Sequence, residues 1–151
     1  MPDTDTRSNA GDNSGDYFSG KKLYGDDFSQ AQIDEWFADE AEGYFNLTQS
    51  ISADYLYGYH ALNLRHGYSL LPEQHFRHVL GVGAAYGDEL APIISKSEQI
   101  IILEPSAGFK STSIKGIPVN YMKPVTSGVI QLASNSIDLV SCLAVLHHIP
   151  N

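Results

Sequence analysis

The stretch FRHVLGVGAAYGDEL, residues 76–90, passes from an apolar run into a glycine-rich turn. The β-branched and apolar side chains of residues 76–82 are typical of a buried strand. Gly81, Gly83 and Gly87 leave room for the backbone to approach a ligand where a Cβ atom would collide. Residues 88–95 are predicted to form a helix. A strand, a glycine-rich turn and a helix in this order indicate a nucleotide-binding loop.

A carboxylate follows at the spacing that adenosine-type cofactors require. The next apolar run, residues 99–103, ends at Glu104, which lies about 20 residues after Gly83. In a strand–loop–helix–strand unit, such an acid sits at the carboxyl end of the neighbouring parallel strand and can accept hydrogen bonds from both ribose hydroxyls. A solvated strand end or a cap for the next segment is the alternative role of Glu104.

The spacing of small residues in the turn distinguishes between two classes of ligand. A dinucleotide fingerprint, GxGxxG or GxGxxA, counted from Gly81 places its third small residue at Tyr86, whose ring is expected to push the helix away from the strand. This position argues against NAD or FAD. Counted from Gly83, a small residue recurs at Ala85 and Gly87, and here the chain resembles the class I S-adenosylmethionine-dependent methyltransferases.

The resemblance extends over residues 76–151. ILEPS at residues 102–106 resembles the family's acidic strand end, and SIDLVSCLAVLHHIPN at residues 136–151 resembles its fourth strand and the following turn. It implies that the cofactor is S-adenosylmethionine. The cofactor-binding residues that it implies are Gly81, Gly83, Ala85 and Gly87 in the loop, Glu104 at the ribose, Pro105 and Ser106 against adenine, and Leu143 and Ala144 near the sulfonium.

Two residues depart from the family pattern. Gly81 stands where the family usually carries an acid that orients the methionine part of the cofactor. Ala85 replaces the middle glycine of the loop, and its extra methyl group is expected to be tolerated only if the local φ stays negative.

No catalytic residue is identified from the sequence. Asp138 opens a strand at the end opposite the cofactor edge, so a structural role is expected. His147 and His148 are adjacent and have no ligand-spaced partner, and no metal site is predicted. One histidine is expected to pack in the turn and the other to face the cleft. Methyl transfer from a sulfonium to a nucleophilic acceptor needs mainly proximity and orientation, which makes a general base optional.

The composition of the chain restricts the kinds of binding partner that are expected. The chain has 151 residues, 9 Lys and Arg, 18 Asp and Glu and a net charge of −9, and its few cations form no basic run. Nucleic acid is therefore an improbable partner, because its binding depends on clustered cations. No long apolar segment and no signal-like start are present, so a membrane association is not predicted. The single Cys142 fits a cytoplasmic location. A small-molecule acceptor is expected, and the oligomeric state is not predicted.

Three regions are expected along the chain: a mobile tail at residues 1–20, a helical extension at 21–72, and an S-adenosylmethionine-binding domain at 73–151. In the extension, Ser29 and Gln32 form a potential capping box for a helix that Gly43 can end. A second helix at 53–65 is expected to place its aromatic side chains, including Tyr59, in packing rather than over a substrate cleft.

The alternating strand and helix patterns of the third region predict an α/β fold, a Rossmann-like parallel sheet with crossover helices. Its strands are expected at residues 76–82, 99–103, 117–121 and 137–143. The resemblance implies a seven-stranded sheet, so this one is expected to be truncated after its fourth strand, in a fragment of a longer methyltransferase. An uncovered apolar edge at residues 137–146 would favour aggregation.

Three functions follow in order of preference. The first is S-adenosylmethionine-dependent methyl transfer to a small-molecule acceptor, with this chain carrying the cofactor-binding half. The second is a nonenzymatic Rossmann-like binding module with a decayed cofactor site, which the departures at Gly81 and Ala85 would suit. The third is a NAD-dependent oxidoreductase.

Overall fold

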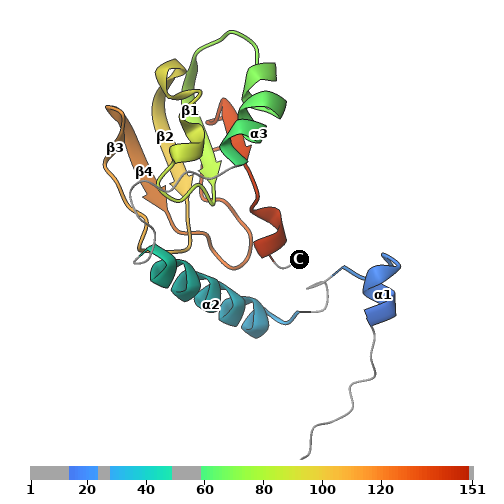
Figure 1. The fold of residues 1–151 in the computed structure, drawn as a ribbon. Helices are drawn as coiled ribbons and strands as arrows, with labels where there is room; N and C mark the ends of the chain where they lie inside the picture. The colour runs from blue at the N-terminus through green and yellow to red at the C-terminus, as the bar shows by residue number, and fades with distance from the viewer. Residues whose placement is uncertain (1–13, 24–27, 49–58, 150–151) are drawn as a thin grey trace, which may run out of the picture.

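The computed structural model describes residues 14–23, 28–48 and 59–149 (Figure 1). Its α-helices are α1 (Ser14–Phe18), α2 (Gln30–Thr48) and α3 (Tyr59–His66). Its strands are β1 (Phe76–Val82), β2 (Ser97–Leu103), β3 (Ser113–Ile114), β4 (Ile117–Met122) and β5 (Leu139–Cys142). Four 3₁₀ turns connect them, η1 (Tyr68–Leu70), η2 (Asp88–Leu90), η3 (Ile94–Lys96) and η4 (Leu146–His148).

The sheet has the order β3-β4-β2-β1-β5, and β1 lies between β2 and β5. The β1–β2, β2–β4 and β1–β5 pairs are parallel, whereas the short β3 runs antiparallel to β4. This mainly parallel sheet confirms the predicted Rossmann-like α/β class. The prediction of β1 is confirmed at both ends, while β2 begins two residues earlier and β5 is shorter than expected.

Apolar side chains of the two central strands form the core. Phe76, Val79, Ile100 and Ile102 are buried on β1 and β2, and Leu90 packs against them from η2. A strand flanked by parallel neighbours has both faces covered, which is why the second halves of these strands, residues 79–82 and 100–103, are continuous apolar runs rather than alternating ones.

The helix predicted at residues 88–95 is wrong. The segment instead forms η2 and η3, with i→i+3 hydrogen bonds from the Leu90 amide to the Gly87 carbonyl (3.0 Å) and from the Ile93 amide to the Leu90 carbonyl (2.9 Å). Pro92 has no amide hydrogen to donate to an α-helical ladder. The crossover between β1 and β2 is therefore a tight chain of 3₁₀ turns.

The helical extension is partly as expected. The capping box is confirmed, because the Ser29 amide donates to Gln32 Oε1 at 2.9 Å and the Gln32 amide donates to Ser29 Oγ at 3.4 Å. The prediction that Gly43 ends this helix is wrong, since α2 continues to Thr48. In the segment expected to be a tail, residues 14–18 form α1.

The packing role expected for the aromatics of the second helix is not seen in the described residues. Only α3, Tyr59–His66, represents that helix, and the expected positions before Tyr59 lie outside the described residues. Tyr59 is 63% exposed and Leu62 is 55% exposed, so neither is a core residue. No helix of the described residues is long and apolar enough to cross a membrane.

β5 forms one edge of the sheet, and Val140 on it is 57% exposed. Asp138, just before β5, ties this edge strand to β1. Its Oδ2 accepts a hydrogen bond from the His78 amide and its own amide donates to the His78 carbonyl, both at 2.9 Å. The structural role expected for Asp138 agrees with this geometry.

Asp138→Ala is expected to lower the melting temperature at pH 7. The His78 amide holds the pKa of Asp138 below its ordinary value of 3.8. A depressed carboxyl pKa contributes stability that is present above the unfolded-state value and is lost as the pH falls through the folded-state value. The difference in melting temperature between Asp138→Ala and the unmodified protein should therefore shrink below about pH 3.8. Asp138→Asn, which keeps an acceptor but cannot ionise, should lack this pH dependence; equal pH profiles for all three proteins would contradict the assignment.

Candidate functional site

A cavity of about 670 Å³ opens at the carboxyl ends of β1, β2 and β5. Val82, Leu103 and Leu143 line it at these strand ends. α2 crosses beyond the same ends of the strands and supplies Trp36 and Tyr44 to the lining (Figure 1). The carboxyl edge of a parallel sheet is where such folds bind ligands, and the volume suits a small-molecule ligand.

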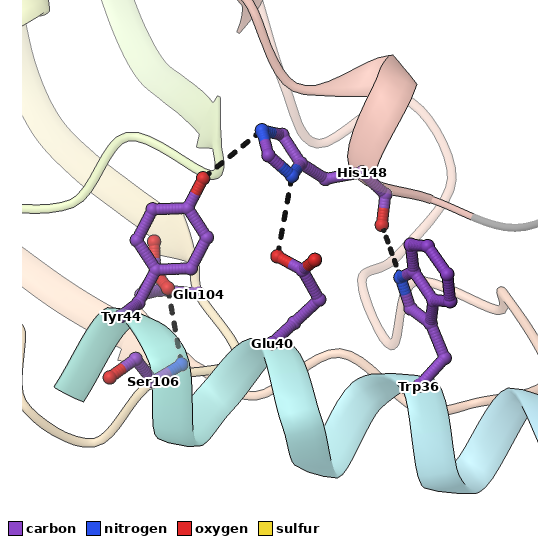
Figure 2. Close-up of polar contacts among 6 residues, drawn as sticks. All are labelled: Trp36, Glu40, Tyr44, Glu104, Ser106 and His148. Atoms are coloured by element: carbon purple, nitrogen blue, oxygen red, sulfur yellow. Dashed lines mark hydrogen bonds and ion pairs between the residues drawn. The ribbon is translucent and has the colours of Figure 1, made fainter. Parts of the chain in front are cut away.

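Glu104 is the carboxylate at the centre of this edge. It follows β2 directly and is 6% exposed. Its Oε2 accepts from the Ala85 amide at 3.3 Å. Its Oε1 accepts from the Ser106 amide at 3.1 Å (Figure 2). Burial raises the pKa of Glu104, and the two amides oppose that shift. The carboxylate therefore joins the glycine-rich loop to the end of β2.

The glycines of the loop are required by the protein itself. Gly83 and Gly87 have φ of 62° and 79°, a left-handed conformation that a side chain disfavours. A Cβ atom on Gly83 would lie 2.7 Å from a methyl group of Val145, and one on Gly87 would collide with Ile114. The space that a Cβ atom would fill at these two glycines is therefore occupied by neighbouring side chains, while the backbone of Gly83 still lines the cavity.

Ala85 does not keep the negative φ that its methyl group was expected to require, because its φ is 49°. A left-handed alanine is strained by about 1–2 kcal/mol. Two hydrogen bonds hold it there: its amide donates to Glu104, and its carbonyl accepts from the Tyr121 hydroxyl at 2.8 Å. Burial, together with the nearby charge of Glu104, raises the pKa of Tyr121 to about 12.

The residues expected to bind cofactor divide into two groups. Gly83, Ala85, Glu104, Pro105, Leu143 and Ala144 line the cavity. Gly81, Gly87 and Ser106 lie outside its lining. Gly81 is buried in β1, where a Cβ atom would lie 2.8 Å from that of Ala84. Ser106 is also buried, and its amide positions Glu104 while its Oγ accepts from the Gly108 amide at 3.2 Å.

His148 connects η4 to α2. Its Nδ1 lies 3.3 Å from Glu40 Oε2, and its Nε2 lies 3.1 Å from the Tyr44 hydroxyl (Figure 2). The indole of Trp36 donates to the backbone carbonyl of His148 at 2.8 Å. The expectation that one histidine packs in the turn while the other faces the cleft is wrong, because both His147 and His148 line the cavity. The sequence could not reveal this contact, since its partners are more than 100 residues apart.

His148→Ala is expected to loosen α2 from the cavity. It removes both side-chain contacts to α2 and keeps only the backbone bond from Trp36. Amide hydrogen exchange of residues 36–44 should therefore become faster, because protection follows local stability. His147→Ala is the matched control, since its ring contacts His148 but forms none of these bonds. Unchanged exchange in His148→Ala would contradict the connecting role.

Aromatic rings form much of the cavity wall. Phe109 contacts Tyr86 edge to face at a ring distance of 5.0 Å and lies 6.3 Å from the ring of Tyr44. Tyr86 is 44% exposed and turns toward Phe109. Its ring therefore does not separate a strand from a following helix, which is the steric conflict that the sequence predicted.

Glu89 is a further carboxylate of the cavity, and sequence reasoning missed it. It lies in η2, and its Oε1 accepts from Ser141 Oγ at 3.1 Å. Ser141 Oγ is also within 3.0 Å of the Tyr68 hydroxyl. Burial raises the pKa of Glu89 to about 7, although the hydrogen bond from Ser141 opposes the shift. Its position two residues after Gly87 was the available signal, because this places it beside the loop.

The structure is a mainly parallel α/β domain with a cavity at its carboxyl edge. Among the residues the structure describes, no group of three or more His, Cys, Asp or Glu could hold a metal ion. No protein-family model and no curated protein matches this sequence.

A likeness is found among solved structures. It is a chain of the complex between the Haloferax volcanii Trm112 methyltransferase activator and a candidate methyltransferase. The TM-score is 0.43 at 15% sequence identity, over 73% of this chain and 46% of that chain. The present chain thus spans less than half the length of that structure, and at this TM-score the likeness carries no argument about function.

Proposed function

We propose that this chain binds S-adenosylmethionine for methyl transfer to a small-molecule acceptor, as the cofactor-binding half of a class I methyltransferase domain. One observation carries the proposal. Glu104 stands at the carboxyl end of β2, held by the Ala85 and Ser106 amides, in a cavity of about 670 Å³. A carboxylate in that place is suited to accept hydrogen bonds from two ribose hydroxyls.

The lining residues fit the cofactor by their chemistry. Glu104 would bind the ribose hydroxyls, Pro105 would lie against adenine, and the loop residues Gly83 and Ala85 would contact the ribose and methionine portion. Leu143 and Ala144 would line the sulfonium side. The cofactor supplies a methyl group on a positively charged sulfur, and the chain's own contribution is to hold that group and the acceptor in line.

The acceptor is proposed to lie between α2 and the carboxyl edge of the sheet. Trp36 and Tyr44 of this helix line the cavity together with Phe109, and such rings suit an apolar or planar molecule. The acidic chain, with a net charge of −9, disfavours a nucleic-acid acceptor. A cytoplasmic location is part of the proposal, because cofactor and acceptor would be small metabolites.

Calorimetric titration with S-adenosylhomocysteine tests the proposal. A thermal melt first establishes that the chain unfolds cooperatively, and NAD is titrated in parallel. Saturable binding of S-adenosylhomocysteine, and no comparable binding of NAD, is expected. Tighter binding of NAD would replace the proposal with the oxidoreductase. A folded chain that binds neither ligand would favour a nonenzymatic module with a decayed site.

A further inference from the structure

Glu89 is a carboxylate at the cavity that has no cationic partner among the described residues. The ion pairs found in that part of the chain involve other residues, and the hydrogen bond from Ser141 reaches only Oε1. No fully buried side-chain oxygen there lacks a hydrogen-bond partner, so the second oxygen of Glu89 is open to the cavity. A carboxylate in such a place is complementary to a cation that a ligand brings.

The sheet places this carboxylate on the far side of the loop from Glu104. Ser141, which donates to Glu89, lies in β5 directly opposite Gly81 of β1. Glu104 follows β2, the neighbour of β1 on its other side. The loop after β1 therefore lies between two carboxylates, one at β2 and one held from β5. An extended ligand lying across the loop would meet both.

The surroundings hold the carboxylate in place, and no lysine or arginine in the described part of the chain lies beside it. Ser141 Oγ contacts both Glu89 and the Tyr68 hydroxyl. No lysine or arginine is among the described residues that line the cavity. The titratable groups near Glu89 or along the same lining are Tyr68 of η1, Cys142 of β5, Asp88 of η2, Tyr86 of the loop, Glu104 after β2, Glu40 and Tyr44 of α2, Tyr59 and His60 of α3, and His147 and His148 of η4.

We propose that Glu89 binds a primary ammonium group of the ligand, with Ser141 and Tyr68 as positioning residues. This inference rests on the proposed function, in which that group is the α-ammonium of the cofactor's methionine portion. An ammonium has N–H donors for the open carboxylate oxygen, whereas a sulfonium has none. A metal ion is the weaker alternative, because the described residues supply no further ligands around Glu89.

Two probes separate the ammonium contact from the rest of the site. S-adenosylhomocysteine carries the ammonium group, and 5′-methylthioadenosine shares its thioadenosine portion but has no ammonium group. Glu89→Gln is expected to weaken the affinity for S-adenosylhomocysteine roughly 10-fold to 100-fold, the range for a lost charged hydrogen bond. The affinity for 5′-methylthioadenosine should change by no more than about twofold. Glu98→Gln, which makes the same change on the exposed start of β2, should alter neither affinity.

Proton release gives an independent readout on the unmodified protein. With a Glu89 pKa of about 7, roughly half of the carboxyl is protonated at pH 7. An ammonium favours the ionised form, so binding of S-adenosylhomocysteine should release up to about half a proton at pH 7. The release is measured as the dependence of the binding enthalpy on the ionisation enthalpy of the buffer. It should be absent with 5′-methylthioadenosine and in Glu89→Gln.

The outcomes distinguish this inference from the proposed function. If S-adenosylhomocysteine binds, but Glu89→Gln weakens both probes equally or neither, the ammonium contact is wrong while the cofactor site stands. If a cooperatively folded chain binds neither probe, the proposed function fails and the inference fails with it. Should Glu89→Gln not fold, the comparison of proton release between the two probes on the unmodified protein decides.

Discussion

Glu104→Gln is expected to weaken S-adenosylhomocysteine binding while the chain still unfolds cooperatively. The substitution removes the charge that would accept the ribose hydroxyls, at a cost of about 1–2 kcal/mol, or roughly 5-fold to 30-fold in affinity. Glu104 is 6% exposed, and the amide keeps an oxygen for one of the two backbone donors. Calorimetry reports the affinity and a thermal melt reports the stability.

Burial limits the loss of stability. Desolvation raises the pKa of Glu104 above its ordinary value of 4.5. A carboxyl whose pKa is raised on folding loses stability as the pH rises from the unfolded-state value through the folded-state value. At pH 7 the gain from removing this buried charge offsets part of the cost of the backbone donor that Gln leaves unpaired, so Glu104→Gln should lower the melting temperature only slightly. A large fall in melting temperature, or unchanged affinity, would contradict a ligand-binding role for this carboxylate; Glu98→Gln is the exposed control on the same strand.

Gly87→Ala is expected to destabilise the chain by about 2–5 kcal/mol. The left-handed φ of 79° costs about 1–2 kcal/mol for a residue with a Cβ atom. The new methyl group would also collide with Ile114 and lie 3.2 Å from Ile102, and overpacking of this kind costs about 1–3 kcal/mol. Urea unfolding measures the change.

Gly43→Ala is the matched control, for which a change in stability of the opposite sign is expected. Gly43 lies within α2, and a Cβ atom there would meet no heavy atom within 4 Å. Alanine in a helix interior is favoured over glycine by about 0.5–1 kcal/mol. The same chemical change should thus stabilise α2, which hydrogen exchange of that helix can detect. Equal effects of the two substitutions would show that the loop conformation has been misjudged.

The sheet could be predicted because its signal is local and strong. The apolar run of residues 76–82 gave β1 with both ends, and the run before Glu104 gave the end of β2. Parallel alternation then brought the glycine-rich loop and Glu104 to one edge. The crossover between β1 and β2 was mispredicted because a helix usually follows a glycine-rich loop of this kind. Pro92, in the middle of the predicted helix, has no amide hydrogen to donate.

The cavity wall could not be predicted, because its contacts are distant in sequence. The bonds from Glu40 and Tyr44 to His148 span more than 100 residues. Periodicity indicates which side of a helix is apolar but not what covers it. Glu89 was missed for a different reason. Its significance depends on Ser141, a small residue inside β5 that carries no distinctive sequence signal.

The most direct test of the cofactor site is a crystal structure of this chain with S-adenosylhomocysteine. Both ribose hydroxyls should lie within about 2.5–3.0 Å of the Glu104 carboxylate, in the cavity between α2 and the sheet. A nucleoside bound elsewhere, or one in this cavity whose ribose does not contact Glu104, would contradict the assignment of Glu104 to the ribose.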